Sequence, residues 1–248
     1  MSRIYGGIHF QFSNRDGLTL GNQIGNYIAT NLLVDNSQNQ IQVDLTTDTA
    51  AFGTTNRDRI TNQAEISGRI NAAPAGAQLT VKIGNGSFTA IPVNSDGTFQ
   101  LDNSKLALIN GGVLPDKAYR LEFKLIDNNG RSIGTTNLDF TLDRSAPTVN
   151  INSLDRITPT GHITGTALDP NGSTSGRFRV DGGSWTSFNT LPNGSFDRVI
   201  NSQGLSAGTH AVELEIADLA GNVAGQNISF TVDNSNNIYA APATNPGW

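Results

Sequence analysis

Five aspartates are the residues whose type and placement could do chemistry in this sequence: Asp127, Asp143, Asp155, Asp218 and Asp233. They stand at the ends of predicted strands or at the junction between two predicted domains. Carboxylate oxygens in loops suit calcium, which takes about 6–8 hard oxygen ligands. No EF-hand loop and no Asp-x-Asp spacing occurs. Calcium binding is therefore one expectation, and metal-free Asx-turns at loop ends are the alternative.

Composition excludes most other metal and catalytic chemistry. The 248 residues include no cysteine and only 3 histidines, which excludes disulfides, thiolate metal sites and cysteine nucleophiles. No Ser-His-Asp constellation, paired catalytic carboxylates or phosphate-binding loop is detectable. The formal net charge is −5 and basic residues are scattered, so we expect neither a nucleic-acid partner nor binding to an anionic membrane surface.

One aromatic residue, Trp185, could stack on a sugar ring, which makes a carbohydrate-binding module an alternative function. Phe88 occupies the equivalent position in an internal repeat. Aromatic residues make up 7% of the sequence, and no platform of several aromatic rings is apparent. We therefore expect Trp185 to pack in the core or on a hairpin.

The elements that would position these residues belong to two copies of one unit. Asp-Arg-Ile-Thr at 58–61 recurs at 155–158, an offset of 155 − 58 = 97. Three more blocks recur at this offset: 66–68 with 163–165, 86–89 with 183–186, and 96–99 with 193–196. The offset falls to 230 − 140 = 90 for Phe140 and Phe230, so the first copy has a longer loop near 106–114. We predict repeats at 46–143 and 144–234, a linker at 34–45, and a linker at 235–248 leading to another module.

Each repeat has the pattern of short strands with one buried face. Apolar and charged residues alternate at 119–125 and again at 212–216, a period of two. Asp181-Gly182 is a strong hairpin signal. About seven such strands per repeat predict an all-β chain of two tandem Ig-like β-sandwiches. The expected core residues are Phe123, Leu125, Phe140, Leu214, Ile216 and Phe230.

The second repeat, and more loosely the first, resembles bacterial Ig-like domains. The resemblance rests on the order and spacing of short motifs: Ser145-Ala146-Pro147-Thr148, Ile163-Thr164-Gly165-Thr166-Ala167, Val180-Asp181-Gly182-Gly183-Ser184-Trp185, Gly208-Thr209-His210, Ala217-Asp218-Leu219-Ala220-Gly221-Asn222 and Phe230-Thr231-Val232-Asp233. Such domains recur in large adhesins and other exported proteins. The resemblance implies an extracellular or cell-surface location, neighbouring domains of a larger protein as partners, a cell-surface or matrix ligand, and calcium at the junctions.

Residues 1–33 lie outside the repeats. An amphipathic helix is predicted here by the spacing of five apolar residues: Leu20, Ile24, Tyr27, Ile28 and Leu32. Before it, Ser2-Arg3, five residues and His9 resemble the last signature motif of vanadium-dependent haloperoxidases and type 2 phosphatidic acid phosphatases. In that family the arginine binds the oxyanion, and the histidine attacks phosphorus or coordinates vanadate. Arg3 and His9 match these positions.

Two departures from this family predict an inactive segment. Ser13 stands where an acidic residue often orients the histidine. The family's Lys…Arg-Pro and Pro-Ser-Gly-His elements are absent from the sequence. We therefore expect residues 1–33 to be a helical remnant that is not catalytic.

The sequence also bears on where the chain acts. No run approaches the ~20 apolar residues of a membrane span, and the N-terminus lacks the ~7–15-residue apolar region of a signal peptide. We expect a fragment of a larger extracellular protein. The expected function is a non-catalytic structural or adhesion spacer without a cofactor other than calcium. The alternatives are a fragment of a haloperoxidase or acid phosphatase-like enzyme with accessory Ig-like domains, and a carbohydrate-binding module.

Overall fold

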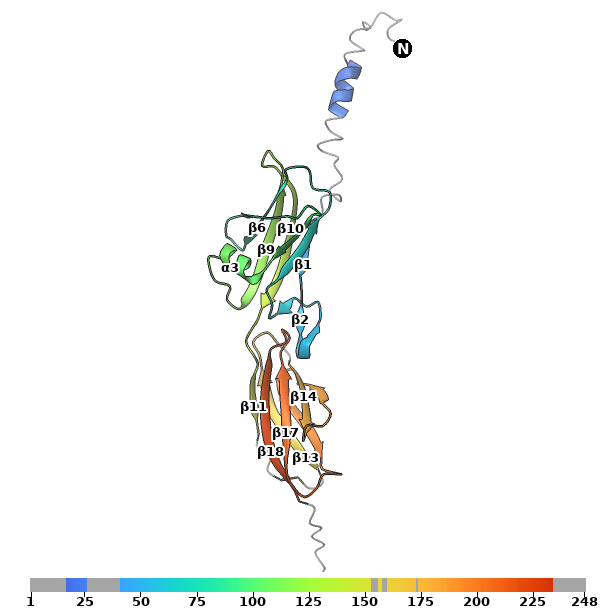
Figure 1. Ribbon diagram of the computed structural model, residues 1–248, viewed down its shortest axis with the longest axis vertical. Helices are drawn as coiled ribbons and strands as arrows, with labels where there is room; N and C mark the ends of the chain where they lie inside the picture. Colours follow the sequence, from blue (N-terminus) through green and yellow to red (C-terminus); the bar gives the residue numbers. More distant parts are fainter. Residues whose placement is uncertain (1–16, 26–40, 153–155, 158–159, 173, 234–248) are drawn as a thin grey trace, which may run out of the picture.

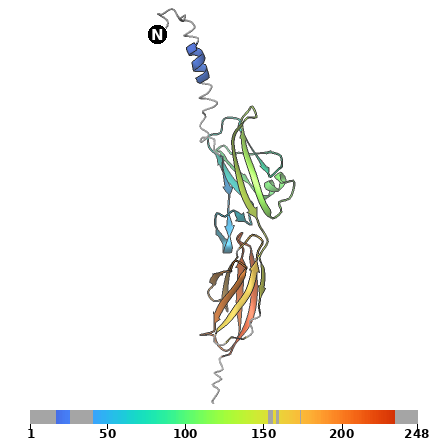
Figure 2. The same ribbon diagram turned by 180° about the vertical axis from the view of Figure 1, so that it is seen from behind.

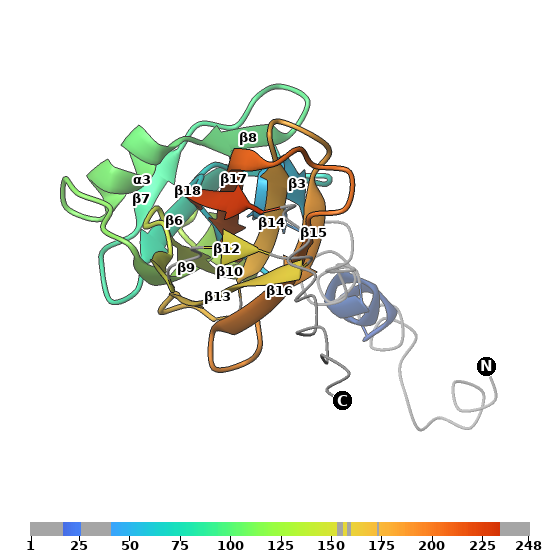
Figure 3. The same ribbon diagram turned by 90° about the horizontal axis from the view of Figure 1, so that it is seen from below.

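Two β-sandwiches follow one another along the chain. The computed structural model describes residues 17–25, 41–152, 156–157, 160–172 and 174–233. The sandwiches are stacked end to end in an elongated molecule (Figures 1 and 2), and they overlie each other along the long axis (Figure 3). Within the described ranges, none of the helices has the length and apolar character needed to cross a bilayer. The predicted all-β fold is confirmed.

The first sandwich consists of a three-stranded sheet, β1-β5-β8, facing a five-stranded sheet, β4-β10-β9-β6-β7. Its strands are β1 (Ile41–Leu45), β4 (Ile60–Thr61), β5 (Ile66–Ile70), β6 (Gln78–Ile83), β7 (Thr89–Ile91), β8 (Thr98–Leu101), β9 (Lys117–Ile126) and β10 (Ser132–Leu142). Short strands β2 (Thr49–Ala50) and β3 (Thr54–Thr55) form a separate hairpin around a 3-10 turn, Ala51–Gly53. Residues 41–45 of the predicted linker at 34–45 thus form strand β1 of the sandwich, which corrects that part of the prediction.

The second sandwich repeats the arrangement with the sheets β11-β13-β16 and β12-β18-β17-β14-β15. Its strands are β11 (Thr148–Ile151), β12 (Arg156–Ile157), β13 (Thr160–Leu168), β14 (Ser175–Val180), β15 (Thr186–Asn189), β16 (Ser195–Asn201), β17 (Gly208–Ala217) and β18 (Val223–Val232). In both sandwiches the short strand β4 or β12 pairs in parallel with the last strand, and the other paired strands are antiparallel. The sequence repeat is therefore a repeat of topology.

Alternating side chains fill a separate core in each sandwich. In β9, Leu121, Phe123 and Leu125 are fully buried, while the residues between them are partly exposed. Leu214 and Ile216 of β17 occupy the equivalent places in the second core. All six predicted core residues are buried. Burial of one face of each strand is what the period of two required.

A glycine in each three-stranded sheet makes room for a core phenylalanine. A Cβ on Gly68 would lie 2.3 Å from Cζ of Phe99, and a Cβ on Gly165 would lie 2.6 Å from Cζ of Phe196. Each glycine pairs directly across the strands with that phenylalanine. The repeated glycine is therefore a packing requirement.

The longer loop predicted near 106–114 contains a helix, α3 (Asn103–Ile109). The Asp102 carboxylate accepts a hydrogen bond from the Lys105 backbone N–H at 2.8 Å and caps the first turn. Leu106 on its inner face is fully buried in the first core. A further helix spans residues 17–25, where Leu18, Leu20 and Ile24 are more than half exposed.

Candidate metal centre at the junction

Three carboxylates meet where the two sandwiches join. Asp143 directly follows β10 of the first sandwich, whereas Asp169 follows β13 and Asp218 follows β17 of the second. One oxygen from each lies within 4.8 Å of the others. Strands of two different sandwiches therefore deliver their carboxyl-terminal aspartates to one point.

The cluster is buried and its oxygens are held by neutral amides. Asp143 and Asp218 are 2% and 1% exposed. The two Asp218 oxygens accept hydrogen bonds from the backbone N–H and the side-chain Nδ2 of Asn222, both at 2.9 Å. Asn171 donates its backbone N–H to Asp169 Oδ1 at 2.7 Å and its Nδ2 to Asp143 Oδ2 at 2.8 Å. These contacts orient the carboxylates but bring no positive charge.

Electrostatics make the arrangement costly without a cation. Burial raises the pKa of Asp218, and the negative charges of Asp143 and Asp169 raise it further against the hydrogen bonds from Asn222. Burial also raises the pKa of Asp169, with a contribution from Asp143. Like charges in a poorly solvated place disfavour ionisation. A bound cation would remove this cost.

One oxygen of the cluster has no hydrogen-bond partner among the residues that the structure describes. Asp169 Oδ2 is buried and makes no hydrogen bond, although its sister oxygen is bonded to Asn171. A buried, unsatisfied carboxylate oxygen is expensive. With oxygen donors only and no sulfur or imidazole in the cluster, the donor set fits a hard divalent cation such as calcium.

Other calcium residues predicted from the sequence lie elsewhere. Asp127 follows β9 at the opposite end of the first sandwich, where its Oδ1 accepts hydrogen bonds from the N–H groups of Asn129 and Arg131. This is the Asx-turn alternative. Asp233 follows β18 at the far end of the second sandwich. Both residues lie at strand ends, as predicted, but apart from the carboxylate cluster at the junction.

Sequence reasoning missed Asp169 and Asn222. The position equivalent to Asp169 in the first repeat is Ala72, so the repeat does not single out Asp169. The segment Leu168-Asp169-Pro170-Asn171-Gly172 directly follows a predicted strand, which was the available signal. Arg3, His9 and Asp155 fall outside the described residues.

Trp185 lies on the outer face of the second sandwich. The Cζ atoms of Arg177 and Arg179 are both 4.5 Å from its ring, and each arginine pairs with a glutamate of β17. Phe88 likewise carries Lys82 and Lys124 near its ring. Trp185 thus packs at its hairpin, outside the core. Two guanidinium groups lie against its ring, where a sugar would have to stack.

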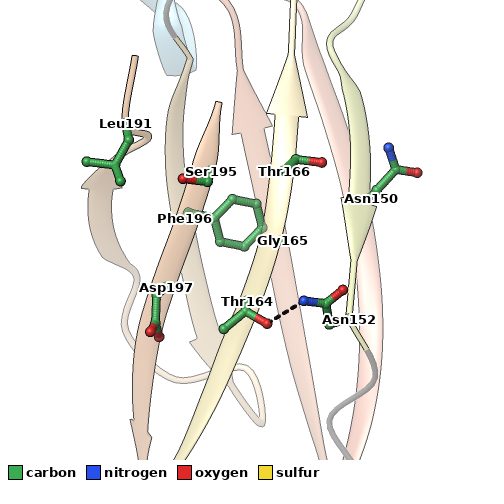
Figure 4. A pocket seen from close by; sticks show the side chains of 9 residues that line it. All are labelled: Asn150, Asn152, Thr164, Gly165, Thr166, Leu191, Ser195, Phe196 and Asp197. Atoms are coloured by element: carbon green, nitrogen blue, oxygen red, sulfur yellow. Dashed lines mark hydrogen bonds between the residues drawn. The ribbon is translucent and has the colours of Figure 1, made fainter. Parts of the chain in front are cut away.

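A shallow polar groove runs over the outside of β11, β13 and β16 (Figure 4). Asn152 Nδ2 donates to Thr164 Oγ1 across it at 2.7 Å. Asp197 Oδ1 is 2.6 Å from His162 Nδ1, but the Ser195 hydroxyl donates to Asn193 instead of facing the imidazole. These residues therefore do not form a Ser-His-Asp triad.

A family model matches the N-terminal part of the chain. Residues 1–35 match the family model of the VCPO second helical-bundle domain, and this agrees with the haloperoxidase-like motif of residues 1–33. No curated protein matches the chain.

Several solved structures are similar to this chain at low identity. Fibronectin(III)-like modules of CbhA from Clostridium thermocellum are 15% identical, with a TM-score of 0.41, over 78% of this chain and 94% of theirs. A Ca²⁺-stabilised ice-binding adhesin of an Antarctic bacterium is 21% identical, with a TM-score of 0.36, over 78% of this chain and 49% of that chain. A 1.5-MDa bacterial ice-binding adhesin is 20% identical, with a TM-score of 0.37, over 79% of this chain and 66% of that chain. These likenesses concern the fold alone.

Proposed function

We propose that residues 41–233 are a non-catalytic spacer of an extracellular or cell-surface protein, and that Ca²⁺ stiffens its junction. The carboxylate cluster of Asp143, Asp169 and Asp218 carries the proposal, because its ligands come from both sandwiches. A cation held there would tie the end of β10 to the top of the second sandwich. Stacked sandwiches joined in this way hold flanking domains apart.

Calcium dependence follows directly from the proposal. A ligand that binds only the folded state at about 100 times its Kd stabilises by roughly 2.7 kcal/mol. For one sandwich of roughly 100 residues, this stabilisation raises Tm by about 10–20 °C. We expect such a shift between chelator and millimolar calcium in a calorimetric melt of the full chain. An unchanged Tm contradicts the proposal.

The variant Asp169→Asn tests whether Asp169 binds a metal ion or only supports the fold. Within the described part of the chain its Oδ2 makes no hydrogen bond, and the substitution removes one of three mutually repelling charges. We expect the variant to be as stable as the parent, or more stable, in chelator, and to lose the calcium shift. Asp127→Asn is the control, since Asp127 is the repeat counterpart of Asp218 at the far end, and it should keep the shift.

A second candidate function is supported by the match of residues 1–35 to the VCPO second helical-bundle domain. The sandwiches would then be accessory to an oxyanion-binding enzyme, with Arg3 and His9 part of its site. We expect the chain itself to be inactive with phosphate esters, and with bromide, peroxide and vanadate. Turnover that disappears in His9→Ala would establish the enzymatic function instead.

A further inference from the structure

The first sandwich carries an insertion that the second lacks. Val43 faces Gly68 across β1 and β5, just as Ile151 faces Gly165 across β11 and β13. The path from Val43 to β4 is much longer than the path from Ile151 to β12. The β2–β3 hairpin, residues 49–55, lies within this extra length, and we call it the docking arm. It reaches from the first sandwich toward the second in Figure 1.

Polar contacts seat the docking arm on the loop between β17 and β18. The Thr49 hydroxyl donates to the Ala220 carbonyl oxygen at 2.6 Å. Next to the arm, Asn62 Nδ2 donates to Asn222 Oδ1 at 3.4 Å. Ala50 and Ala220 are both buried. The arm and the loop therefore exclude water from their contact.

The backbones approach closely at a glycine of the same loop. Gly221 has φ +88°, and a Cβ built on it would lie 2.5 Å from the Ala50 carbonyl oxygen. The counterpart in the first sandwich, Gly130, has φ +75° and open space at the same position. Both turns need a left-handed residue. Only Gly221 is also needed for contact with the arm.

Phe52, at the tip of the arm, contacts the guanidinium group of Arg177 on the second sandwich. Arg177 Cζ lies 4.4 Å from the Phe52 ring and 4.5 Å from the Trp185 ring. Glu215 Oε2 accepts hydrogen bonds from this guanidinium at 2.6–2.7 Å and fixes it. Phe52 itself has φ +56°, a strained conformation for a bulky residue that needs support from its surroundings.

The acceptor surface is specific to the second sandwich. The positions that match Arg177, Ala220 and Asn222 in the first sandwich are occupied by Thr80, Asn129 and Arg131. At these three positions the first sandwich therefore lacks the Arg177 guanidinium that Phe52 contacts, the small Ala220 beside the arm and the Asn222 amide that Asn62 contacts. The corresponding surface of the first sandwich therefore does not match the docking arm.

We propose that the docking arm recognises the β17–β18 loop and Arg177 of the following sandwich, and that this fixes both the order of the modules and their relative orientation without a metal. Domains within one chain move relative to each other unless their interface restrains them. The arm supplies that restraint through Thr49, Ala50 and Phe52, none of which belongs to the carboxylate cluster, although the β17–β18 loop that it contacts also carries Asp218. Its effect persists when calcium is removed.

The test is the distribution of distances between the two sandwiches in the full chain. Because the chain has no cysteine, Asn137→Cys and Asn227→Cys give a clean pair of spin labels at matched exposed positions of β10 and β18. In chelator, double electron–electron resonance should give one narrow distance peak. Gly221→Ala should abolish the narrow peak, and Gly130→Ala, with the same backbone strain but no contact, should preserve it.

Phe52→Ala provides a second variant that leaves both cores intact. We expect it to broaden the distribution, whereas Phe88→Ala, which removes an equivalent ring away from the junction, should not. A broad distribution for the parent chain in chelator that narrows with calcium overturns the docking arm but leaves the proposed calcium-stiffened spacer standing. A narrow peak that survives both Gly221→Ala and Phe52→Ala also overturns it.

Discussion

At the scale of single residues, the junction depends on side chains that are not shared between the two repeats. Asp169 has alanine as its counterpart in the first repeat, and Asn222 has arginine. Asp169 belongs to the carboxylate cluster and Asn222 donates a hydrogen bond to Asp218 of that cluster, because β13 and β17 end beside Asp143. Their role at the junction depends on where the fold places them. Residue type alone therefore does not identify them as site residues.

We expect His210 to make the stability of the second sandwich depend on pH. Its Nδ1 is 2.6 Å from Asp181 Oδ2, and its Nε2 is 2.9 Å from the Ser206 carbonyl oxygen. The hydrogen bond to Asp181 raises the pKa of His210, and the Ser206 carbonyl raises it further. Two acceptors on one ring favour the imidazolium form.

The direction of the pH effect follows from the raised pKa of His210. The stabilisation is fully present below the unfolded pKa of about 6.5 and is lost as pH rises through the higher folded pKa. We expect urea melts of the second sandwich to show stability falling over that interval. His210→Gln should flatten this dependence, while His162→Gln serves as the control at an exposed pair. Equal slopes for parent and His210→Gln would contradict the assignment.

At the scale of elements, the strands follow the sequence pattern closely. Asp181 and Gly182 both have positive φ, 49° and 71°, as the predicted turn after β14 requires. The alternation at 119–125 and 212–216 lies in β9 and β17 with the apolar face inward. Two elements departed from expectation: β1 lies in a predicted linker, and α3 lies in a predicted loop. Both are short, so the chain's local pattern specifies them weakly.

Replacing the glycine that lies against a core phenylalanine is expected to lower the stability of that sandwich. In Gly165→Ala, the new Cβ would lie 2.4 Å from the Asn150 carbonyl oxygen and 2.6 Å from Phe196 Cζ. Backbone and a buried ring have little freedom to move, and overpacking of this kind costs about 1–3 kcal/mol. We expect the urea midpoint of the second sandwich to fall accordingly.

Gly225→Ala is the matched control for that substitution. Gly225 also lies in a strand, β18, but nothing lies within 4 Å of the place that an alanine methyl group would take there. It should leave the midpoint unchanged or raise it slightly, because alanine restricts the unfolded chain. Equal effects at the two positions would show that the close approach of Phe196 is unimportant.

At the scale of the whole molecule, two separate cores are joined by a junction with two kinds of restraint. The cores share no residue, so each sandwich has its own source of stability. The carboxylate cluster joins them through Asp143, and the docking arm joins them through Phe52 and Ala50. Removal of calcium is therefore expected to lower Tm while both sandwiches remain folded at ambient temperature.

The sequence by itself determined the twin all-β units, their core faces, the main hairpin and two of the three clustered aspartates. These features are local or repeated: a period of two or a matched block at fixed offset needs no knowledge of distant neighbours. Tertiary structure alone decided that Asp169 joins Asp143 and Asp218, and that the residues after β1 form an arm resting on the next sandwich. Such contacts join segments as far apart as Thr49 and Ala220, and only packing of the whole chain brings their oxygens and backbones within reach.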